Sequence, residues 1–436
     1  MGRAHARRPA ARSPGAALRV VEYDPVNRRI LAALSYGHLA TDLSQGAIPA
    51  LLPVFRSEYH LSYTQLGLIV LLANVSSSVI QPAFGVLSDR VKMYWLMPTG
   101  MLVASAGIVL AVTVRDYPTL VAMICLSGLG VAAFHPEGYK HAGRASGVRR
   151  ATGMSYFSVG GNLGYGLGPA ATSIAITWWG KHGIAYSLPF AIVGAVVMWR
   201  IVSPWAASHD GDETAAVPSA APRKPIGSIA GRAALWVVAL LVTFVVLRSW
   251  IQVGTASYIP LYFTGVRHMS ATYGGVLVSV FLGAGGLGTL LGGVAADRWG
   301  HRNMLIVSMA MLPPFLWMIP RTSGVWVVIA ALIAGMAVVS TFAVAMVMAQ
   351  NAIPHRLGLI SGLIIGFAIG MGGVGTTLLG GIADRWGVLR AMDVTALLPA
   401  AALAIALVLP KDARPGRNSV PHPSRTCMSG ANAGGK

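Results

Sequence analysis

Long apolar stretches separated by short polar breaks fill the chain from about residue 30 to residue 409. Each stretch is about twenty residues long, the length that a helix needs to cross the hydrocarbon core of a bilayer. We count twelve of them, and the widest break in the pattern, at 206–232, divides them six and six. The pattern predicts an all-α polytopic membrane protein with twelve transmembrane helices.

A six-residue motif occurs twice, at the end of the second apolar stretch of each half. Residues 85–90 read GVLSDR, and residues 293–298, which begin 208 positions later, read GVAADR. In both copies a glycine precedes the acid by four residues, which permits two helices to approach closely where the Asp-Arg pair leaves the membrane. Glycine-rich stretches that start at Thr152 and Ser361 repeat with an offset of 209. Two markers that repeat with nearly the same offset predict two pseudo-symmetric six-helix bundles, as in secondary transporters.

These patterns divide the chain into five segments. No convincing cleavage site precedes the first span, so we interpret the start of the chain as a tail and not as a signal peptide. The segments are a disordered basic cytoplasmic tail at 1–29, an N-terminal six-helix bundle at 30–205, a cytoplasmic linker at 206–232, a C-terminal six-helix bundle at 233–410 and a disordered cytoplasmic tail at 411–436.

Composition and charge narrow the class of protein further. Of the 436 residues 55% are hydrophobic and 11% are charged, which lies outside the range of soluble globular proteins. The net charge of +19 is explained by orientation, because most of the 33 Lys and Arg fall on segments that a twelve-span topology places in the cytoplasm. Nucleic-acid binding is excluded, since no basic face with readout elements is present. Cys125 and Cys427 imply no disulfide framework and no metal site.

Ionisable residues interrupt two spans of the first half. His38 and Asp42 lie four residues apart in the first span, on one helical face. His135 and Glu137 flank Pro136 toward the cytoplasmic end of the fourth span. A carboxyl group at mid-membrane costs about 2.5–3.5 kcal/mol on insertion scales, so Asp42 is expected to face a cavity or a partner. All four are candidates for proton coupling. The alternatives are a structural hydrogen bond for the first pair and a wetted helix end for the second.

Arg248 is the basic residue that we place inside a span, the seventh, and Gln252 and Tyr258 follow it there. A guanidinium inside the membrane must be matched by a carboxylate, by water or by an anionic ligand. These three residues are therefore candidates for substrate binding, and a structural partner for the arginine is the alternative.

The fifth span is rich in glycine and contains Gly164, Gly168 and Pro169. Glycines at four-residue spacing remove the side chains from one helix face. We expect this face to permit helix packing with close backbone contact across the interface between the halves. The run is no phosphate-binding loop, because it lies inside an apolar span and not between a strand and a helix.

With twelve spans, a central linker and the repeated motif, the chain resembles transporters of the major facilitator superfamily. In that family the Asp and Arg of the motif latch the cytoplasmic side closed by pairing with neighbouring helices, so the resemblance implies this role for Asp89 and Arg90. The first copy lacks the glycine that usually follows, whereas the second has it at Gly300. The residues for which we expect a gating role are Gly85, Asp89, Arg90, Gly293, Asp297 and Arg298.

A closer resemblance is to the fosmidomycin-resistance branch of the superfamily. The segments that carry it are residues 35–43, 81–82, 134–137, 160–162 and 361–375. The resemblance implies export of fosmidomycin, a small phosphonate antibiotic, and of other compounds in exchange for protons. Asn162, which belongs to one of these segments, is a further candidate for substrate binding. Gly164, Gly168 and Pro169 also resemble part of a signature of proton-coupled exporters.

We therefore predict a proton-coupled efflux transporter, a drug/H+ antiporter that exports small antibiotics, above all fosmidomycin-like phosphonates, by alternating access. The alternative is an uptake symporter that imports a small anion together with protons. A membrane sensor is disfavoured, because such proteins often append a soluble signalling domain. An enzyme is disfavoured more strongly, because no nucleophile-base pair, metal cluster or cofactor loop has interpretable spacing.

The expected partners follow from this prediction. They are a small-molecule substrate, protons and the lipid bilayer, with no nucleic acid, no cofactor and no bound metal. We expect the chain to function as a monomer. It is expected to be a multi-pass protein of the bacterial cytoplasmic (inner) membrane with both termini in the cytoplasm.

Overall fold

The computed structural model describes residues 26–209, 232–353, 356, 359–360, 362–368 and 370–411. Every regular element within these ranges is helical. The predicted tails and linker lie almost wholly outside the described residues, so what we expect of them stays a prediction.

The first bundle contains six membrane crossings, of which the second and the sixth are each built from successive helical pieces. The helix that ends this bundle continues to Ser208, three residues beyond the predicted boundary at 205. The elements in order are α1 (Arg28–Tyr59), α2 (Tyr63–Asn74) with η1 (Val75–Val79) and α3 (Gln81–Arg90), α4 (Leu96–Ala111), α5 (Tyr117–Ala145), α6 (Arg150–Trp179), and α7 (Ser187–Val197) with η4 (Met198–Val202) and α8 (Ser203–Ser208).

The second bundle repeats this plan. Its elements are α9 (Arg232–Gly265), α10 (Ala271–Trp299), α11 (His301–Met318), α12 (Val325–Ala352), η7 (Gly362–Ala368) with α14 (Gly372–Trp386), and α15 (Val388–Val408). Among the described residues, 8 helical stretches are long and apolar enough to cross a membrane, and one of them, Thr152–Ser208, holds two crossings. The helices α1, α4 and α11 supply three more. The prediction of twelve membrane helices in two six-helix bundles is confirmed.

Local sequence explains where several of these helices begin and end. The Ser62 hydroxyl accepts a hydrogen bond from the Gln65 backbone N–H at the start of α2, and the Gln65 side chain accepts one from the Ser62 N–H, which is a capping box. The helices α10 and α14 both end at a glycine with positive φ, 93° at Gly300 and 85° at Gly387. Only glycine adopts this conformation without strain, so both helices stop there.

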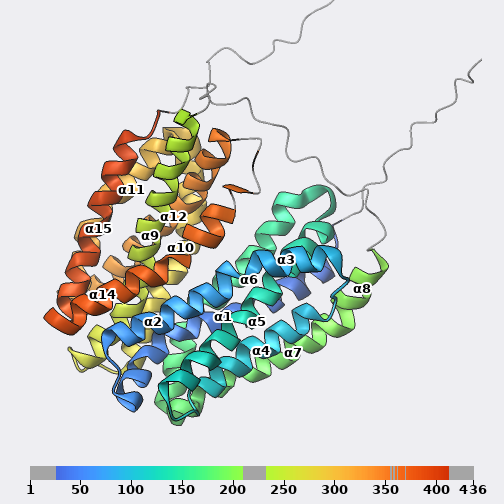
Figure 1. Cartoon of the computed structure of the whole chain (residues 1–436), viewed down its shortest axis with the longest axis horizontal. Helices are drawn as coiled ribbons and strands as arrows, with labels where there is room; N and C mark the ends of the chain where they lie inside the picture. Colours follow the sequence, from blue (N-terminus) through green and yellow to red (C-terminus); the bar gives the residue numbers. More distant parts are fainter. Residues whose placement is uncertain are drawn as a thin grey trace, which may run out of the picture.

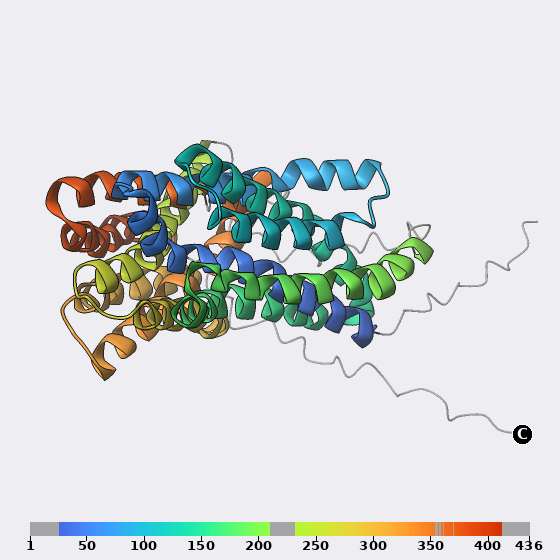
Figure 2. The same ribbon diagram turned by 90° about the horizontal axis from the view of Figure 1, so that it is seen from below.

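The two bundles are in contact at one end of the molecule and diverge at the other (Figure 1). We call the end where α8 finishes and α9 starts the linker end, and the opposite end the far end. In the view from below, α14 and α2 again lie side by side at the far end (Figure 2). The most extensive contacts between the bundles are those of α2 with α14 and of α6 with α10. In the second pair, the Ala170 N–H donates to Ser279 Oγ at 2.8 Å, and the hydroxyls of Thr177 and Thr272 lie 2.8 Å apart.

The glycine face of α6 packs against α1 of its own bundle, which corrects the expected partner. A Cβ atom added at Gly164 would lie 3.0 Å from Leu39 Cα, and one at Gly168 would lie 2.7 Å from the Gly46 carbonyl carbon. Such distances show that the α1 and α6 backbones are in direct contact. Pro169 is the member of this group that faces the other bundle, because its carbonyl lies beside Gly275 of α10.

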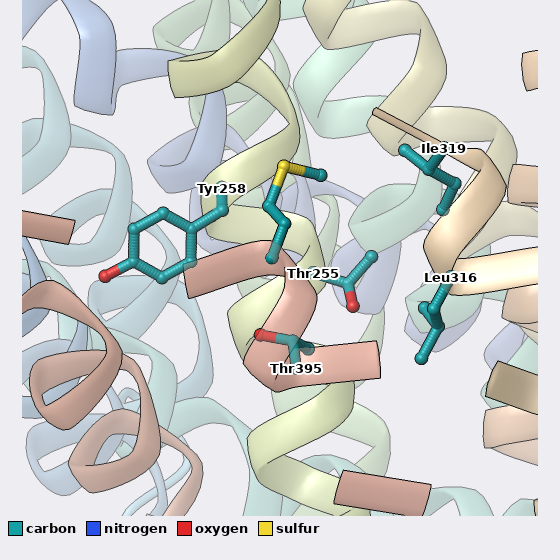
Figure 3. Close-up of a pocket in the computed structure, with 6 residues that line it drawn as sticks. Thr255, Tyr258, Leu316, Ile319 and Thr395 are labelled. Atoms are coloured by element: carbon teal, nitrogen blue, oxygen red, sulfur yellow. The ribbon is translucent and has the colours of Figure 1, made fainter. Parts of the chain in front are cut away.

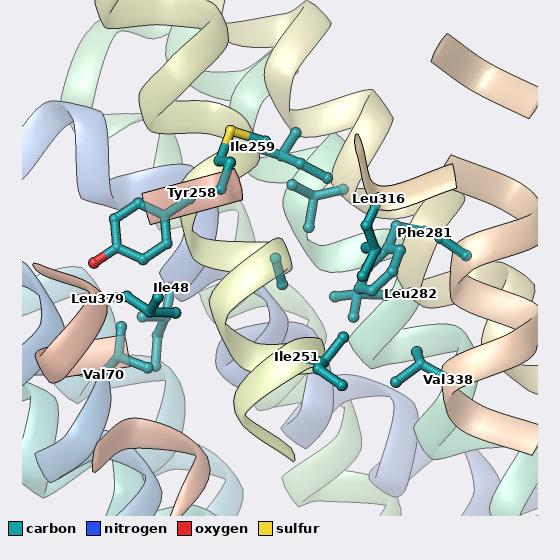
Figure 4. Close-up of a cluster of buried hydrophobic side chains, with 14 of the residues drawn as sticks. Ile48, Val70, Ile251, Tyr258, Ile259, Phe281, Leu282, Leu316, Val338 and Leu379 are labelled. Atoms are coloured by element: carbon teal, nitrogen blue, oxygen red, sulfur yellow. The ribbon is translucent and has the colours of Figure 1, made fainter. Parts of the chain in front are cut away.

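Buried apolar side chains form one continuous cluster that crosses between the bundles (Figure 4). Ile48 and Val70 of the first bundle belong to the same cluster as Tyr258 and Leu379 of the second. A separate cluster around Phe134 lies within the first bundle alone. Because lipid tails are as apolar as these side chains, close packing and not exclusion from water stabilises such contacts inside a membrane.

We expect Gly288→Ala in α10 to lower the thermal stability of the purified protein. A Cβ atom there would lie 2.7 Å from Met336 Cα in α12, and overpacking of this kind costs about 1–3 kcal/mol. Gly286→Ala in the same helix is the matched control, since nothing lies within 4 Å of its Cβ position. Thermal unfolding in detergent measures both variants, and equal melting temperatures would contradict this description of the packing.

Candidate transport site

Three buried ionisable side chains from two helices of the first bundle meet in one cluster, which we call the triad. His38 and Asp42 come from α1, and His135 comes from α5. Asp42 Oδ2 lies 3.3 Å from His38 Nε2, and Asp42 Oδ1 lies 3.4 Å from His135 Nε2. Their exposed fractions are 8% for Asp42, 4% for His38 and 8% for His135. The predicted pair within α1 is thus extended by a histidine from the fourth span.

Backbone carbonyls determine which nitrogen of each imidazole carries a hydrogen. His38 Nδ1 lies 2.9 Å from the Phe157 carbonyl oxygen, and His135 Nδ1 lies 2.9 Å from that of Val131. A carbonyl oxygen can only accept, so each Nδ1 must donate. A neutral imidazole held in this way presents a bare Nε2, itself an acceptor, to a carboxylate oxygen. Asp42 Oδ1 is accordingly a buried oxygen with no donor.

The triad therefore needs a positive charge between its nitrogens and the carboxylate. Two imidazoles and a carboxylate bind protons, and they are also a ligand set that transition metals use. The candidate ligand atoms of the three residues all lie within 4.8 Å of one another. The expectation of no metal site rested on spacing along the chain, which does not reveal that α1 and α5 bring these residues together.

Aromatic rings enclose the triad. The His38 ring stacks on Phe157 with centroids 4.2 Å apart, and Tyr139 lies 5.0 Å from the same phenylalanine. Tyr139 is 44% exposed, so the aromatic side chains around the triad extend to the accessible surface. On the α6 side, a Cβ atom at Gly161 would overlap the His38 ring and lie 2.7 Å from its Cδ2, so only glycine leaves this ring in place.

Glu137 faces away from the triad and joins a second cluster. Its carboxylate accepts a short hydrogen bond from the Ser88 hydroxyl in α3, and it lies 2.9 Å from His141 Nε2 and 3.4 Å from Lys140 Nζ. The glutamate therefore connects α5 to the first copy of the repeated motif. His141 is fully buried and was not singled out in the sequence, although its i+4 position from Glu137 was a usable signal.

Arg248 is buried in the second bundle and, among the described residues, forms no ion pair with a carboxylate. Its Nε donates to the Val338 carbonyl at 3.0 Å, and a terminal nitrogen donates to Gln252 Oε1 at 2.6 Å. Its guanidinium also lies 5.3 Å from the centre of the Phe342 ring. The exposed fraction of Arg248 is 4%. Neutral partners orient the guanidinium and leave its charge uncompensated, which suits an anionic ligand.

Tyr165, which sequence reasoning missed, lies against α1 one turn beyond Asp42, because a Cβ atom on Gly46 would lie 3.1 Å from Tyr165 Cα. Its phenol is within electrostatic range of both Asp42 and Arg248. Within the described part of the chain its hydroxyl has no hydrogen-bond partner. The missed signal was the tyrosine inside the glycine run of the fifth span.

Asn162 lines a cavity of about 510 Å³ between α6 and α10. The residues that line it come from 154–167 of α6, which is mainly the half of that helix nearer the linker end, and from 279–290, the middle of α10. The same two helices are hydrogen-bonded to each other in their far halves. Asn162 is therefore accessible from the space between the bundles.

Tyr258 lies in the core of the second bundle. It is 1% exposed, and its hydroxyl donates to the Thr376 carbonyl of α14 at 2.9 Å. Its ring borders a small cavity of about 10 Å³, and its hydroxyl points away from the other labelled residues (Figure 3). This placement favours a packing role, so the substrate set proposed below omits Tyr258.

The gating candidates at the linker end make few contacts in this conformation. Asp297 and Arg298 are exposed, and within the described residues neither forms an ion pair or a hydrogen bond. Nothing lies within 4 Å of a Cβ atom built on Gly293, and the nearest atom to one on Gly85 is 3.8 Å away. Arg90 is exposed. The side chain of Asp89 lies outside the described residues, so the latch expected there stays a prediction.

Two six-helix bundles, each with buried ionisable residues, define the fold of a membrane transporter. Comparison with known proteins agrees, because the family model of the Major Facilitator Superfamily matches residues 34–374. The chain belongs to the Major Facilitator Superfamily and, within it, to the branch of the fosmidomycin resistance protein. It is a multi-pass inner-membrane transporter and not an enzyme.

Two curated relatives cover most of the chain. The fosmidomycin resistance protein of Escherichia coli (strain K12) is 32% identical over 373 residues, 85% of this chain and 90% of the relative. The uncharacterized MFS-type transporter YfnC of Bacillus subtilis (strain 168) is 30% identical over 387 residues, 88% of this chain and 93% of the relative.

Solved structures share the fold at low sequence identity. A mutant of the nucleoside transporter NupG superposes with a TM-score of 0.70 at 10% identity, covering 87% of this chain and 99% of that chain. A bacterial homolog of the human lysosomal transporter Spinster, in an inward-facing and unoccupied conformation, gives 0.67 at 13% identity, covering 88% and 97%.

We expect both triad histidines to carry their hydrogen on Nδ1 when neutral. Nitrogen-15 NMR of the histidine-labelled protein, assigned by the loss of signals in His38→Gln and His135→Gln, measures this directly. His182, which is exposed, serves as a reference for an unconstrained ring in solution. Nε2-protonated neutral rings at positions 38 and 135 would contradict the hydrogen-bond assignment on which the triad depends.

Proposed function

We propose that this protein is a proton-coupled efflux transporter that exports small anionic antibiotics, phosphonates of the fosmidomycin kind in particular, in exchange for protons. The observation that carries the proposal is a pair of complementary buried sites. One is the triad, which is short of positive charge, and the other is Arg248, which has no carboxylate among the described residues to neutralise it.

The triad is suited to carry the coupling proton. Its two Nε2 atoms and the Asp42 carboxylate oppose one another as acceptors unless a proton lies between them, so losing a proton raises the energy of the buried cluster. Each of the two contacts can hold one proton. We expect the two orientations of the transporter to bind these protons with different affinities. This difference couples the movement of protons to the movement of substrate.

Arg248 is suited to bind the anionic group of the substrate. A guanidinium matches phosphonate and phosphate oxygens with paired hydrogen bonds, and Gln252 holds it by a single bond of 2.6 Å. Asn162 and Tyr165 offer further polar contacts from α6, and Tyr165 is within range of both charged sites. Such a chain of contacts would let a bound anion affect the protonation of Asp42.

We place the linker end in the cytoplasm, with both termini there, because the positive-inside rule then accounts for the basic charge of the loops. In this orientation the two bundles are in contact at the outer side of the membrane and are separated at the inner side. Export requires the bundles to rock so that the site opens outward. We propose that one chain is sufficient for this cycle.

We expect Asp42→Asn to reduce proton-coupled export by about tenfold or more, a loss that corresponds to about 1.4 kcal/mol or more. The amide cannot alternate between charged and neutral forms, so the triad would no longer exchange protons with the cargo. Reconstituted vesicles with an imposed proton gradient and a pH indicator measure both fluxes. Asp116→Asn, at an exposed helix cap, is the control.

The same assay separates export from its alternatives. Protons that move with the substrate and not against it would indicate an uptake symporter. Undiminished coupling in Asp42→Asn would remove the triad from the mechanism. Stoichiometric zinc retained by the purified protein and required for transport would replace the proton with a metal ion.

We expect Arg248→Gln to weaken transport of a phosphonate by at least tenfold, and to affect neutral drugs much less. Removing the guanidinium eliminates the charge that binds the anion while keeping polarity and approximate length. Competition binding to the detergent-solubilised protein and vesicle transport measure the difference. Arg267→Gln, at an exposed position, is the control. Equal losses for anionic and neutral substrates would assign Arg248 a structural role.

A further inference from the structure

A third copy of the glycine-acid motif lies at the far end of the molecule. Residues 380–387 read GGIADRWG, and residues 292–300 read GGVAADRWG. Gly380 precedes Asp384 by four residues, just as Gly293 precedes Asp297. The third copy closes α14 at the far end, whereas the other two copies close their helices at the linker end. The same device therefore occurs on both sides of the membrane.

The third copy matches the second in local structure as well as in sequence. The helices α10 and α14 end at Trp299 and Trp386, and the next residue has positive φ in both. The Gly300 N–H donates to the Ala296 carbonyl at 2.9 Å, and the Gly387 N–H donates to that of Ala383, also at 2.9 Å. Both motifs thus present their acid from the last turn of a helix.

Asp384 binds the first turn of α2 in the opposite bundle. Its Oδ1 accepts from the Tyr63 N–H at 2.7 Å, and its Oδ2 accepts from the Thr64 N–H at 3.0 Å and from the Thr64 hydroxyl at 2.6 Å. The first N–H groups of a helix have no partner within the helix, and the positive end of its dipole favours an anion. Ser62 satisfies the next N–H, that of Gln65.

Gly380 makes this contact possible. A Cβ atom there would lie 2.5 Å from the Tyr63 carbonyl oxygen and 2.8 Å from Thr64 Cα. Farther along the pair, one at Gly67 would lie 2.5 Å from Thr377 Cα. The α2 and α14 backbones are therefore in contact at the far end.

The copy of the motif at the linker end, Gly293 to Arg298, makes no comparable contact with the opposite bundle among the described residues. Gly293 has nothing within 4 Å of its Cβ position, and Asp297 is exposed and, among the described residues, forms no hydrogen bond or ion pair. A cavity of about 510 Å³ separates α10 from the facing half of α6. The motif is thus engaged where the bundles touch and free where they diverge.

We propose that Asp384 with Gly380 is a latch that holds the far end closed, and that it is released when the linker end closes. The latch joins an acid of one bundle to a helix terminus of the other, so opening the far end must break all three hydrogen bonds at Asp384. In that step the motif at Asp297 gains its partners. Neither substrate nor proton takes part in the contact, so the inference stands apart from the proposed function.

The test measures the positions of the two ends directly. Nitroxide labels are placed in a Cys125→Ser, Cys427→Ser background, either at Ser57 and Ser323 on exposed sites of the far end or at Ser208 and Asn303 on exposed sites of the linker end. Electron-electron double resonance on the full chain in nanodiscs reports the distance distribution of each pair. Transport need not be known for this measurement.

We expect Asp384→Asn to shift the population by about tenfold or more toward the far-end-open form, because hydrogen bonds to a charged group are roughly twice as strong as neutral ones. Thr64→Val removes one of the three bonds and is expected to give a smaller shift in the same direction. Gly380→Ala should shift the population in that direction too.

Gly293→Ala is the matched control at the linker end. It is expected to leave the far end closed, since its Cβ has free space in the present conformation. Unchanged distance distributions in both Asp384→Asn and Thr64→Val, with melting temperatures close to that of the parent, would overturn the proposal. If Asp384→Asn fails to fold, Thr64→Val alone decides, because it retains both backbone bonds.

Discussion

A charged side chain without a partner is costly, above all when it is buried, and the arrangement of this protein depends on how three charges are matched, two of them buried and one exposed. In the first bundle the carboxylate of Asp42 faces two imidazoles whose donors are already engaged by backbone carbonyls. In the second, the guanidinium of Arg248 is oriented by neutral groups, the only partners that the described residues supply. At the far end the carboxylate of Asp384 is satisfied by the start of a helix. The first two sites are incomplete without a proton and an anion, whereas the third is complete as it stands.

Glycine residues determine where two helix backbones come into contact, both within one bundle and between the two bundles. Between α1 and α6, glycines bring the two backbones together inside one bundle, and this contact stays whatever the other bundle does. Between α2 and α14, glycines bring the bundles themselves into contact, next to the acid that binds the helix start. Packing that holds a bundle rigid and packing that can separate thus use the same residue type, and they differ only in which helix lies opposite.

These features together describe a transporter in one of its two orientations. The bundles share an apolar core toward the far end and have separate surroundings toward the linker end, where Gly293 and Asp297 of the motif have no partners in the part of the chain that the structure describes. Tyr165 lies within electrostatic range of Asp42 in one bundle and of Arg248 in the other. A rocking motion would exchange the engaged and free copies of the motif while leaving the triad intact, because all three of its residues belong to one bundle.

The sequence by itself determined the twelve helices, the duplication and the family, because membrane spans must be long and apolar and because the repeat keeps a constant offset. It also singled out Asp42, His38, His135 and Arg248, since ionisable residues inside apolar spans are conspicuous. The tertiary structure decided which of these side chains are in contact with each other. His135 joins Asp42 although Glu137, two residues away, points to Ser88, and Tyr258 enters the core. A linear pattern records helix faces but not which helix lies opposite each face, and that choice depends on packing between segments far apart in the chain.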